Sequence, residues 1–253
     1  MNCVFITAIK TPTNEVRSEG YSYSVESWKR WCRANKVELR VLEQPLFDGM
    51  KPNFFRYWCF DLLEDEFDQI CLVDADTVIH PDCPNFFNLT RGRFSAVHND
   101  GDYDWIIRSI ENYQHEFPNT FGFKFNIWKY FNSGFLIINK GSHEPLFKDF
   151  QDFVLLNYEN GTLPAIQSKY GVGTDQPLIN LFVQKYGGAD GWLELLPYAF
   201  NMQDLARKNI LDDRMLFTNI PGIYHFNAVP AGPGEVNKWM KKTYQFLHHE
   251  NHI

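Results

Sequence analysis

The sequence lacks a long apolar segment, a dense run of Lys or Arg, and a recognisable secretion signal. No apolar stretch approaches the roughly 18 residues that a membrane-spanning helix needs. Residues 1–10 do not show the basic region and the long apolar region of a signal peptide. The formal net charge of −7 argues against a nucleic-acid-binding surface. We therefore expect a soluble, cytoplasmic protein with no transmembrane segment and no nucleic-acid partner.

Cysteine is also scarce. The cysteines are five in number, scattered through apolar segments and without a CxxC pair: Cys3, Cys32, Cys59, Cys71 and Cys83. An odd number with no regular spacing is typical of reduced core thiols and of a reducing compartment.

The first part of the chain alternates strand patterns with helix patterns, and its 253 residues are enough for one large domain. Apolar runs with strand character lie at residues 3–8, 37–42 and 70–73. In the helix pattern before the third run, one face carries Phe55, Trp58 and Leu62. A βαβαβ order predicts an α/β fold with parallel strands, and we expect a single domain over residues 1–253.

Two carboxylates, Asp74 and Asp76, directly follow the third apolar run. The carboxyl ends of strands are where open α/β sheets bind ligands. Two acids one residue apart can hold one divalent cation, and oxygen ligands suit Mg²⁺ or Mn²⁺. A solvated Asx turn is the alternative interpretation of this pair.

Polar residues interrupt several later apolar patterns. Asp100 lies in an acidic, turn-rich segment after a strand pattern at residues 94–98, and Asn132 stands two residues before Gly134, which predicts a bulge or a close backbone approach. His225 lies in a short strand pattern, where a lone histidine is more often a satisfied core group than a ligand.

A further polar pair, Asp175 and Gln176, stands at the start of a helical pattern. Thr174 before the pair is the predicted N-cap, and Pro177 falls in the first turn. The two side chains therefore lie beside the positive end of the helix dipole.

Taken in order, these segments resemble a known family. The strings FRYWCFDLL, LVDADTVI, YFNSGFLIIN, DQPLIN and IYHFN are similar to those of the retaining GT-A glycosyltransferases of family 8, the glycogenin and lipopolysaccharide galactosyltransferase type, over about residues 3–227. The resemblance implies a GT-A fold with a Rossmann-like, mostly parallel central sheet flanked by helices. It also implies a nucleotide-binding half at residues 1–76 and an acceptor half at residues 77–253 that includes a C-terminal metal-ligand segment.

The resemblance also implies roles for individual residues. Asp74, Asp76 and His225 would bind Mn²⁺, with Mg²⁺ as the second choice. An imidazole beside two carboxylates shifts the preference toward Mn²⁺. The residues implied to contact the rest of the donor are Arg56, Asp100 and Asn132 at the sugar or phosphates, Asp175 and Gln176 at the anomeric face as the catalytic pair, and Thr7 and Ala8 at the base and ribose.

Lys238 is the implied diphosphate-binding lysine, although the segment before it departs from the family pattern. Family members follow the metal histidine with a short Gly-x-x-Lys-Pro-Trp sequence, whereas here AVPAGPGEVNKW follows Asn227. The implied reaction moves a hexose from a UDP-sugar to an unknown glycan, lipid or protein acceptor, with retention at the anomeric carbon.

Two other functions fit part of the sequence. The Asp74-Ala-Asp76-Thr77 pattern also fits the nucleophile motif of haloacid-dehalogenase phosphatases, in which the first Asp attacks phosphorus. That motif normally ends the first strand, whereas here a βαβα stretch precedes it. A sugar-nucleotide-binding or glycan-binding module without turnover is the second alternative.

Overall fold

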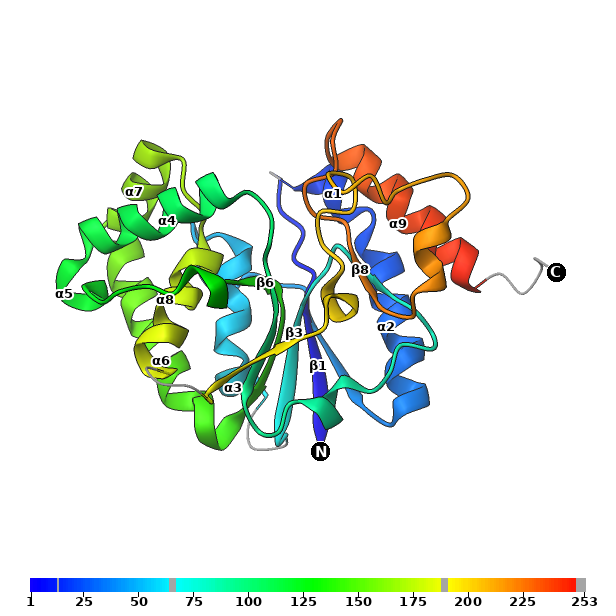
Figure 1. Ribbon diagram of the computed structural model, residues 1–253, viewed down its shortest axis with the longest axis horizontal. Helices are drawn as coiled ribbons and strands as arrows, with labels where there is room; N and C mark the ends of the chain where they lie inside the picture. The colour runs from blue at the N-terminus through cyan, green and yellow to red at the C-terminus, as the bar shows by residue number, and fades with distance from the viewer. Residues whose placement is uncertain (13, 64–66, 188–190, 249–253) are drawn as a thin grey trace.

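The computed structural model describes residues 1–12, 14–63, 67–187 and 191–248, which form two β-sheets flanked by helices (Figure 1). The strands are β1 (Asn2–Thr7), β2 (Glu38–Leu42), β3 (Gln69–Asp74), β4 (Thr77–Ile79), β5 (Phe94–His98), β6 (Phe131–Asn139), β7 (Leu193–Leu196) and β8 (Ile223–His225). The α-helices are α1 (Glu15–Ser18), α2 (Tyr21–Asn35), α3 (Cys59–Leu62), α4 (Tyr103–Glu116), α5 (Pro118–Phe121), α6 (Lys140–Glu159), α7 (Thr162–Tyr170), α8 (Asp175–Gly187) and α9 (Pro233–His248). Short 3₁₀ helices are η1 (Pro52–Trp58), η2 (Phe86–Leu89), η3 (Ile127–Lys129), η4 (Tyr198–Asn201) and η5 (Leu216–Asn219).

The larger sheet has the strand order β2-β1-β3-β6-β5-β7, and β6 alone runs antiparallel to its neighbours. β1 pairs in parallel with β2 and with β3, as the βαβαβ pattern predicts. Thr7 lies opposite Asp74, so the carboxyl ends of β1 and β3 meet at one edge of the sheet. The prediction of an α/β fold with a mostly parallel central sheet is confirmed.

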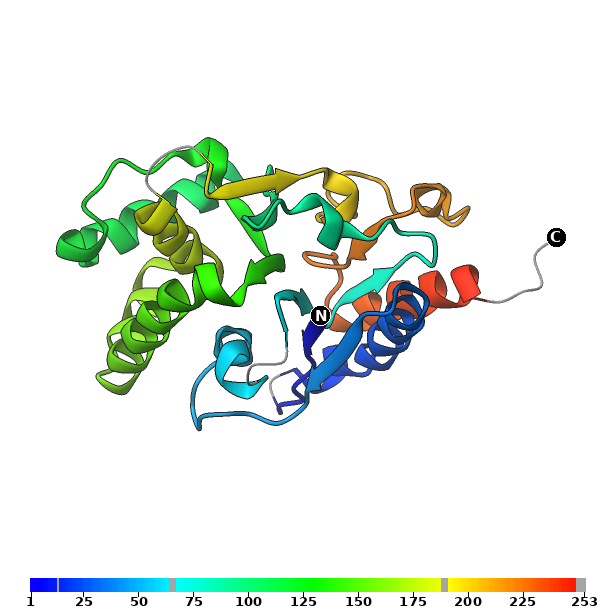
Figure 2. The same cartoon turned by 90° about the horizontal axis from the view of Figure 1, so that it is seen from below.

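Helices cover both faces of this sheet, which explains why its central strands are apolar without alternation. In β1, Val4 and Ile6 pack on the side of α2, whereas Cys3 and Phe5 pack on the side of η1, α3 and α6. The view in Figure 2 shows α4–α8 and the pair α2 and α9 on opposite sides of the sheet. The five cysteines are buried and form no disulfide among the described residues, as expected of core thiols.

The predicted helix after residue 51 forms differently from the expectation. Residues 52–58 are a 3₁₀ helix, and the α-helix begins only at Cys59. With three residues per turn, Phe55 and Trp58 fall on the same buried face of the 3₁₀ helix. Helix α3 already ends at Leu62, and Leu63 follows it with a non-helical backbone. Leu62 is 41% exposed, and Leu63 takes the inner position at 7%. Leu62 is therefore not part of the predicted apolar face.

The smaller sheet pairs β4 with β8 in antiparallel fashion, so a strand near residue 78 meets one near residue 224. Helix α9 packs against α1 and α2 beside this sheet (Figure 1). Within the described residues, no helix combines the length and the hydropathy that crossing a bilayer requires.

Candidate active site

Asp74 and Asp76 lie on a tight turn between β3 and β4. Asp74 ends β3, and Thr77 begins β4. The Thr77 hydroxyl donates a 2.8 Å hydrogen bond to the backbone carbonyl of Asp74, and the Trp28 indole donates to the Thr77 oxygen at 3.0 Å. A buried threonine thus fixes the turn, so both carboxylates leave the sheet toward the same side.

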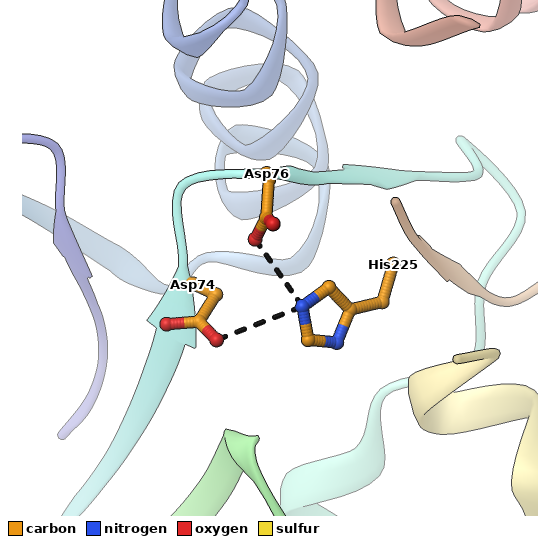
Figure 3. A group of neighbouring side chains, drawn as sticks. All are labelled: Asp74, Asp76 and His225. Atoms are coloured by element: carbon orange, nitrogen blue, oxygen red, sulfur yellow. Dashed lines mark ion pairs between the residues drawn. The ribbon is translucent and has the colours of Figure 1, made fainter. Parts of the chain in front are cut away.

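His225 reaches the two carboxylates because β8 pairs with β4. Thr77 lies opposite His225 in that pairing, and the Phe226 N–H donates to the Asp76 carbonyl at 2.9 Å. The His225 Nε2 atom is 3.2 Å from Asp76 Oδ1 and 3.6 Å from Asp74 Oδ2 (Figure 3). One ligand atom from each of the three residues lies within 4.8 Å of the others.

Gly134 of β6 lies directly against this group. A Cβ atom at residue 134 would lie 2.4 Å from His225 Cε1 and 2.7 Å from Asp74 Oδ2. The strand bulges here: Ala96 pairs with Leu136, but Val97 pairs with Asn132. The predicted bulge and close backbone approach at Gly134 are confirmed, and they leave room for a cation between the three side chains.

In each carboxylate, one oxygen pairs with an arginine and the other faces His225. Arg56 pairs with Asp74 Oδ1, while Asp74 Oδ2 faces His225. Arg17 pairs with Asp76 Oδ2, while Asp76 Oδ1 faces His225. Two guanidinium groups therefore balance the two carboxylates from outside, and the inner oxygens converge.

These contacts shift the ionisation of the buried groups. Burial by itself raises the pKa of Asp76, but the charges of Arg17 and His225 outweigh it and hold that pKa well below its usual range. Burial lowers the pKa of His225, but Asp76 outweighs burial and the pKa is raised above the ordinary histidine value. Asp76 thus favours the protonated, positively charged imidazole of His225. A divalent cation that binds this imidazole competes with the proton.

A cavity of about 630 Å³ opens on this group and contains most of the predicted site. Of the predicted residues, those lining the cavity are Thr7, Arg56, Asp74, Asp76, Asn132, Asp175, Gln176 and His225. Residues from β1, η1, β3, β6, α8 and β8 therefore meet at the carboxyl edge of the sheet, although they are widely separated in the sequence.

Asp175 and Gln176 are both held by hydrogen bonds at the start of α8. Asp175 is 5% exposed and accepts a 2.9 Å hydrogen bond from the Tyr57 hydroxyl and another from the Asn53 amide. The Gln176 side chain accepts from the Ser133 N–H at 3.1 Å and donates to the Tyr130 oxygen at 3.1 Å. Their positions are thus set by η1 and β6 rather than by the helix alone.

The other predicted residues do not line this cavity in the described part of the chain. Ala8 is buried beside it. Asp100 pairs with Lys208 at 2.8 Å, and its side chain is 49% exposed. Lys238 is exposed on α9, where it pairs with Glu235 at 3.3 Å.

Asn99, rather than Asp100, is the inward residue after β5. Asn99 is 7% exposed and lines a second cavity of about 230 Å³. Adjacent residues of an extended chain point to opposite sides, so a one-residue error in phase exchanges the inner and outer side chains. Asn99 rather than Asp100 therefore lines the second cavity, and the donor contact of Asp100 stays a prediction.

The geometry agrees with a comparison to known protein families. The sequence profile of glycosyl transferase family 8 matches residues 48–230, which is more than half of the chain and includes Asp74, Asp76 and His225. The chain belongs to glycosyl transferase family 8. A search of curated proteins finds no significant sequence match.

Solved structures of glycosyltransferases share the fold. A glycosyltransferase involved in the glycosylation of the major capsid of PBCV-1 superposes with a TM-score of 0.60 at 10% identity, covering 94% of this chain and 98% of that one. GlyE of Streptococcus pneumoniae TIGR4 gives 0.51 at 14% identity, covering 99% of this chain and 63% of that one. The bifunctional glycosyltransferase WbbM gives a TM-score of 0.52 at 14% identity, covering 89% of this chain and 45% of that one. The GT-A fold is confirmed.

The site fits the divalent cation that GT-A glycosyltransferases of this kind usually use. Two carboxylate oxygens and one imidazole nitrogen converge, and Gly134 keeps the space between them free of a side chain. Two carboxylates and one imidazole together form a donor set that suits a divalent cation.

Several residues of the site were not predicted from the sequence. Arg17 on α1 and Asn201 on η4 both touch metal-site residues, and Tyr21, Asn14 and Asn53 line the cavity. The carboxyl-edge rule could have pointed to Arg17, because α1 follows the end of β1. No sequence pattern pointed to Asn201, because its contact with His225 depends on the long-range bridge between Met202 and Tyr224.

Proposed function

We propose that this family 8 glycosyltransferase transfers a hexose from a UDP-sugar to an acceptor hydroxyl with retention at the anomeric carbon. The observation that carries the proposal is the convergence of Asp74, Asp76 and His225 within 4.8 Å at the rim of a cavity of about 630 Å³. Mn²⁺ held by these residues would stabilise the negative charge that builds on the leaving diphosphate. The comparisons give no support to a phosphatase or to a module without turnover.

The cavity offers separate groups for each part of the donor. In this proposal Thr7 at the end of β1 contacts the nucleoside, because it lines the cavity and its hydroxyl is buried without a hydrogen-bond partner among the described residues. Arg56 contributes positive charge near the phosphates. Asn132 and Gln176 present amide groups that suit sugar hydroxyls, because a buried amide that binds a hydroxyl rejects ligands without one.

The side chains favour front-side substitution over a covalent glycosyl-enzyme. Asp175 is the carboxylate near the expected anomeric position, but Tyr57 and Asn53 already hold its oxygens. In the proposed step the bond from the anomeric carbon to the diphosphate oxygen breaks, and its electron pair stays on that oxygen. The acceptor oxygen bonds to the anomeric carbon from the same face, and the acceptor proton passes to the diphosphate. Gln176 stabilises the oxocarbenium-like transition state.

The second cavity is the proposed place of the acceptor. It shares Trp105, Asn132, Gln176 and Asn227 with the main cavity, so the two adjoin each other. Asp204 and Ala228 line it with left-handed backbones, at φ of 56° and 51°, and such strain concentrates at functional sites. The Trp105 ring and the polar groups of Asp204 and Arg207 suit the stacking and hydrogen bonding of a sugar ring.

The test measures hydrolysis of a panel of UDP-sugars with and without Mn²⁺. We expect Mn²⁺-stimulated hydrolysis that Asp76→Asn and His225→Ala each reduce at least a hundredfold, with the folded state checked by circular dichroism. NMR of the transfer product should show the anomeric configuration of the donor. Mg²⁺-dependent phosphate release from a phosphomonoester without UDP binding would instead support a phosphatase, and UDP binding without turnover would support a binding module.

A further inference from the structure

The two arginines beside the metal-site carboxylates differ in how many hydrogen bonds their guanidinium groups make within the protein. Arg56 is 4% exposed, and all its nitrogens are engaged: Nε donates to the Asn53 carbonyl at 3.1 Å, Nη1 to the Ser133 carbonyl at 2.8 Å, and Nη2 to Asp74. Arg56 is therefore fixed by the protein itself.

Arg17 has donors left over. Its side chain is 35% exposed and lines the main cavity, and among the described residues its one hydrogen bond goes from Nη2 to Asp76 Oδ2. A guanidinium has five N–H donors in a rigid fork that matches phosphate oxygens. Arg17 can therefore keep its contact to Asp76 and still donate to an anion in the cavity.

Helix α9 supports Arg17 rather than bringing a lysine to the cavity. The Asn237 side chain of α9 accepts a 3.0 Å hydrogen bond from the Gly20 N–H and donates to the Val16 carbonyl. These two contacts flank Arg17 in the sequence and fix the short helix α1. The next residue, Lys238, is exposed and pairs with Glu235. Both α1 and α9 lie outside the family match at residues 48–230.

We infer that Arg17 is the residue that receives the leaving diphosphate, in the role that the family resemblance gives to Lys238, and that Asn237 is its positioning residue. This inference rests on the proposed function. When the bond to the anomeric carbon breaks, the diphosphate gains one negative charge until the acceptor proton arrives. Arg17 neutralises that charge with a fork of N–H groups, and a lysine would supply only a point charge.

The test is titration calorimetry with three probes: Mn²⁺ alone, UDP with Mn²⁺, and uridine with Mn²⁺. Arg17→Gln should bind Mn²⁺ alone several-fold more tightly, because a cation beside Asp76 has been removed. It should bind UDP about tenfold more weakly and uridine as tightly as the unaltered protein does. Arg17→Lys should recover part of the UDP affinity. Lys241→Gln, at an exposed lysine of α9, is the matched control with no change, and Lys238→Gln compares the two candidates for the diphosphate.

The opposite signs for Mn²⁺ and UDP separate a phosphate contact from a mere support of the metal site. Weaker Mn²⁺ binding in Arg17→Gln, or a loss of UDP affinity in Lys238→Gln as large as in Arg17→Gln, would overturn the inference. If the unaltered protein binds UDP and Arg17→Gln binds it equally well, Arg17 has no such role. If the unaltered protein does not bind UDP with Mn²⁺, the proposed function itself is wrong.

Discussion

The Nδ1 atom of His225 lies 3.0 Å from the side-chain oxygen of Asn201. Neighbouring hydrogen bonds fix the direction of this contact. The Gly134 N–H donates to Asn132 Oδ1, so that oxygen accepts, and Asn201 Nδ2 donates to the same oxygen at 2.9 Å. Asn201 Oδ1 is therefore the acceptor from the Nδ1–H of His225. One buried amide thus directs His225 Nε2 toward the carboxylates and connects it to the predicted sugar-binding Asn132.

Asn201→Leu should weaken Mn²⁺ binding by about 10–100-fold, because partners of metal-ligating histidines have effects of this size. Asn201→Asp should keep Mn²⁺ binding, since a carboxylate still accepts a hydrogen bond from the imidazole. It should weaken the binding of UDP-sugar more than the binding of UDP, because Asn132 loses a hydrogen-bond donor. Calorimetry measures both affinities. Asn157→Leu, which removes a buried asparagine from α6, is the control. Equal losses in both Asn201 variants would contradict the proposed direction of the contact.

Gly134→Ala should abolish detectable Mn²⁺ binding, because the new methyl group would lie 2.4 Å from His225 Cε1 and 2.7 Å from Asp74 Oδ2. His225 is 3% exposed and cannot move away without a cost of about 1–3 kcal/mol in stability. Gly141→Ala is the matched control, since nothing lies within 4 Å of its Cβ position. Electron paramagnetic resonance of Mn²⁺ measures the bound fraction. Normal binding in Gly134→Ala would show that the site is not at this group.

Gln176→Ala should lower kcat at least tenfold and leave the donor KM nearly unchanged. This split is expected of an interaction made mainly in the transition state. Steady-state kinetics with the preferred UDP-sugar gives both constants. A raised KM with normal kcat would mean that Gln176 binds the ground state instead. A glycosyl adduct on Asp175, detected by mass spectrometry, would refute front-side substitution.

His143 should make folding stability depend on pH. Burial lowers the pKa of His143 from 6.5 to about 4, and its Nδ1 atom accepts a 2.8 Å hydrogen bond from the Asn139 N–H, which protonation would break. A lowered folded-state pKa means that this stability is complete above pH 6.5 and is lost as the pH falls toward 4. The loss at pH 5 is about 2 kcal/mol.

Urea unfolding at pH 7 and pH 5 measures this effect. His143→Asn should lose about 2 kcal/mol less than the unaltered protein between the two pH values, because an amide does not titrate in this range. His115→Asn changes an exposed histidine on α4 and serves as the control. Parallel losses in the unaltered protein and in His143→Asn would rule out this role for His143.

The sequence predicts the parts of the site that depend on local patterns. Asp74 and Asp76 were found because an apolar strand ends at them, and Gly134 because a glycine interrupts a strand. Their meeting with His225 came from the family resemblance, since no local pattern reports that β4 pairs with β8. The division of the chain into two halves at residue 76 stays a prediction.

Other parts of the site depend on features that no local pattern reports. Composition does not give the phase of a strand at its end, and Asn99 rather than Asp100 lines the second cavity. The position of α9, which carries Lys238, depends on packing against α1 and α2 across the whole chain. The predicted roles of Asp100 and Lys238 stay predictions. Arg17 was missed because α1 has only four residues and therefore no periodicity to read.

The pairing of β4 with β8 also has a consequence during synthesis. Asp76 leaves the ribosome about 150 residues before His225, the difference of 225 and 76. At a translation rate of about 5–20 residues per second, His225 is synthesised roughly 7–30 s after Asp76. The nascent chain cannot assemble its cation site in that interval. Metal capture by all three side chains therefore follows the synthesis of β8, and the metal supply acts on a chain in which β4 and β8 have already been made.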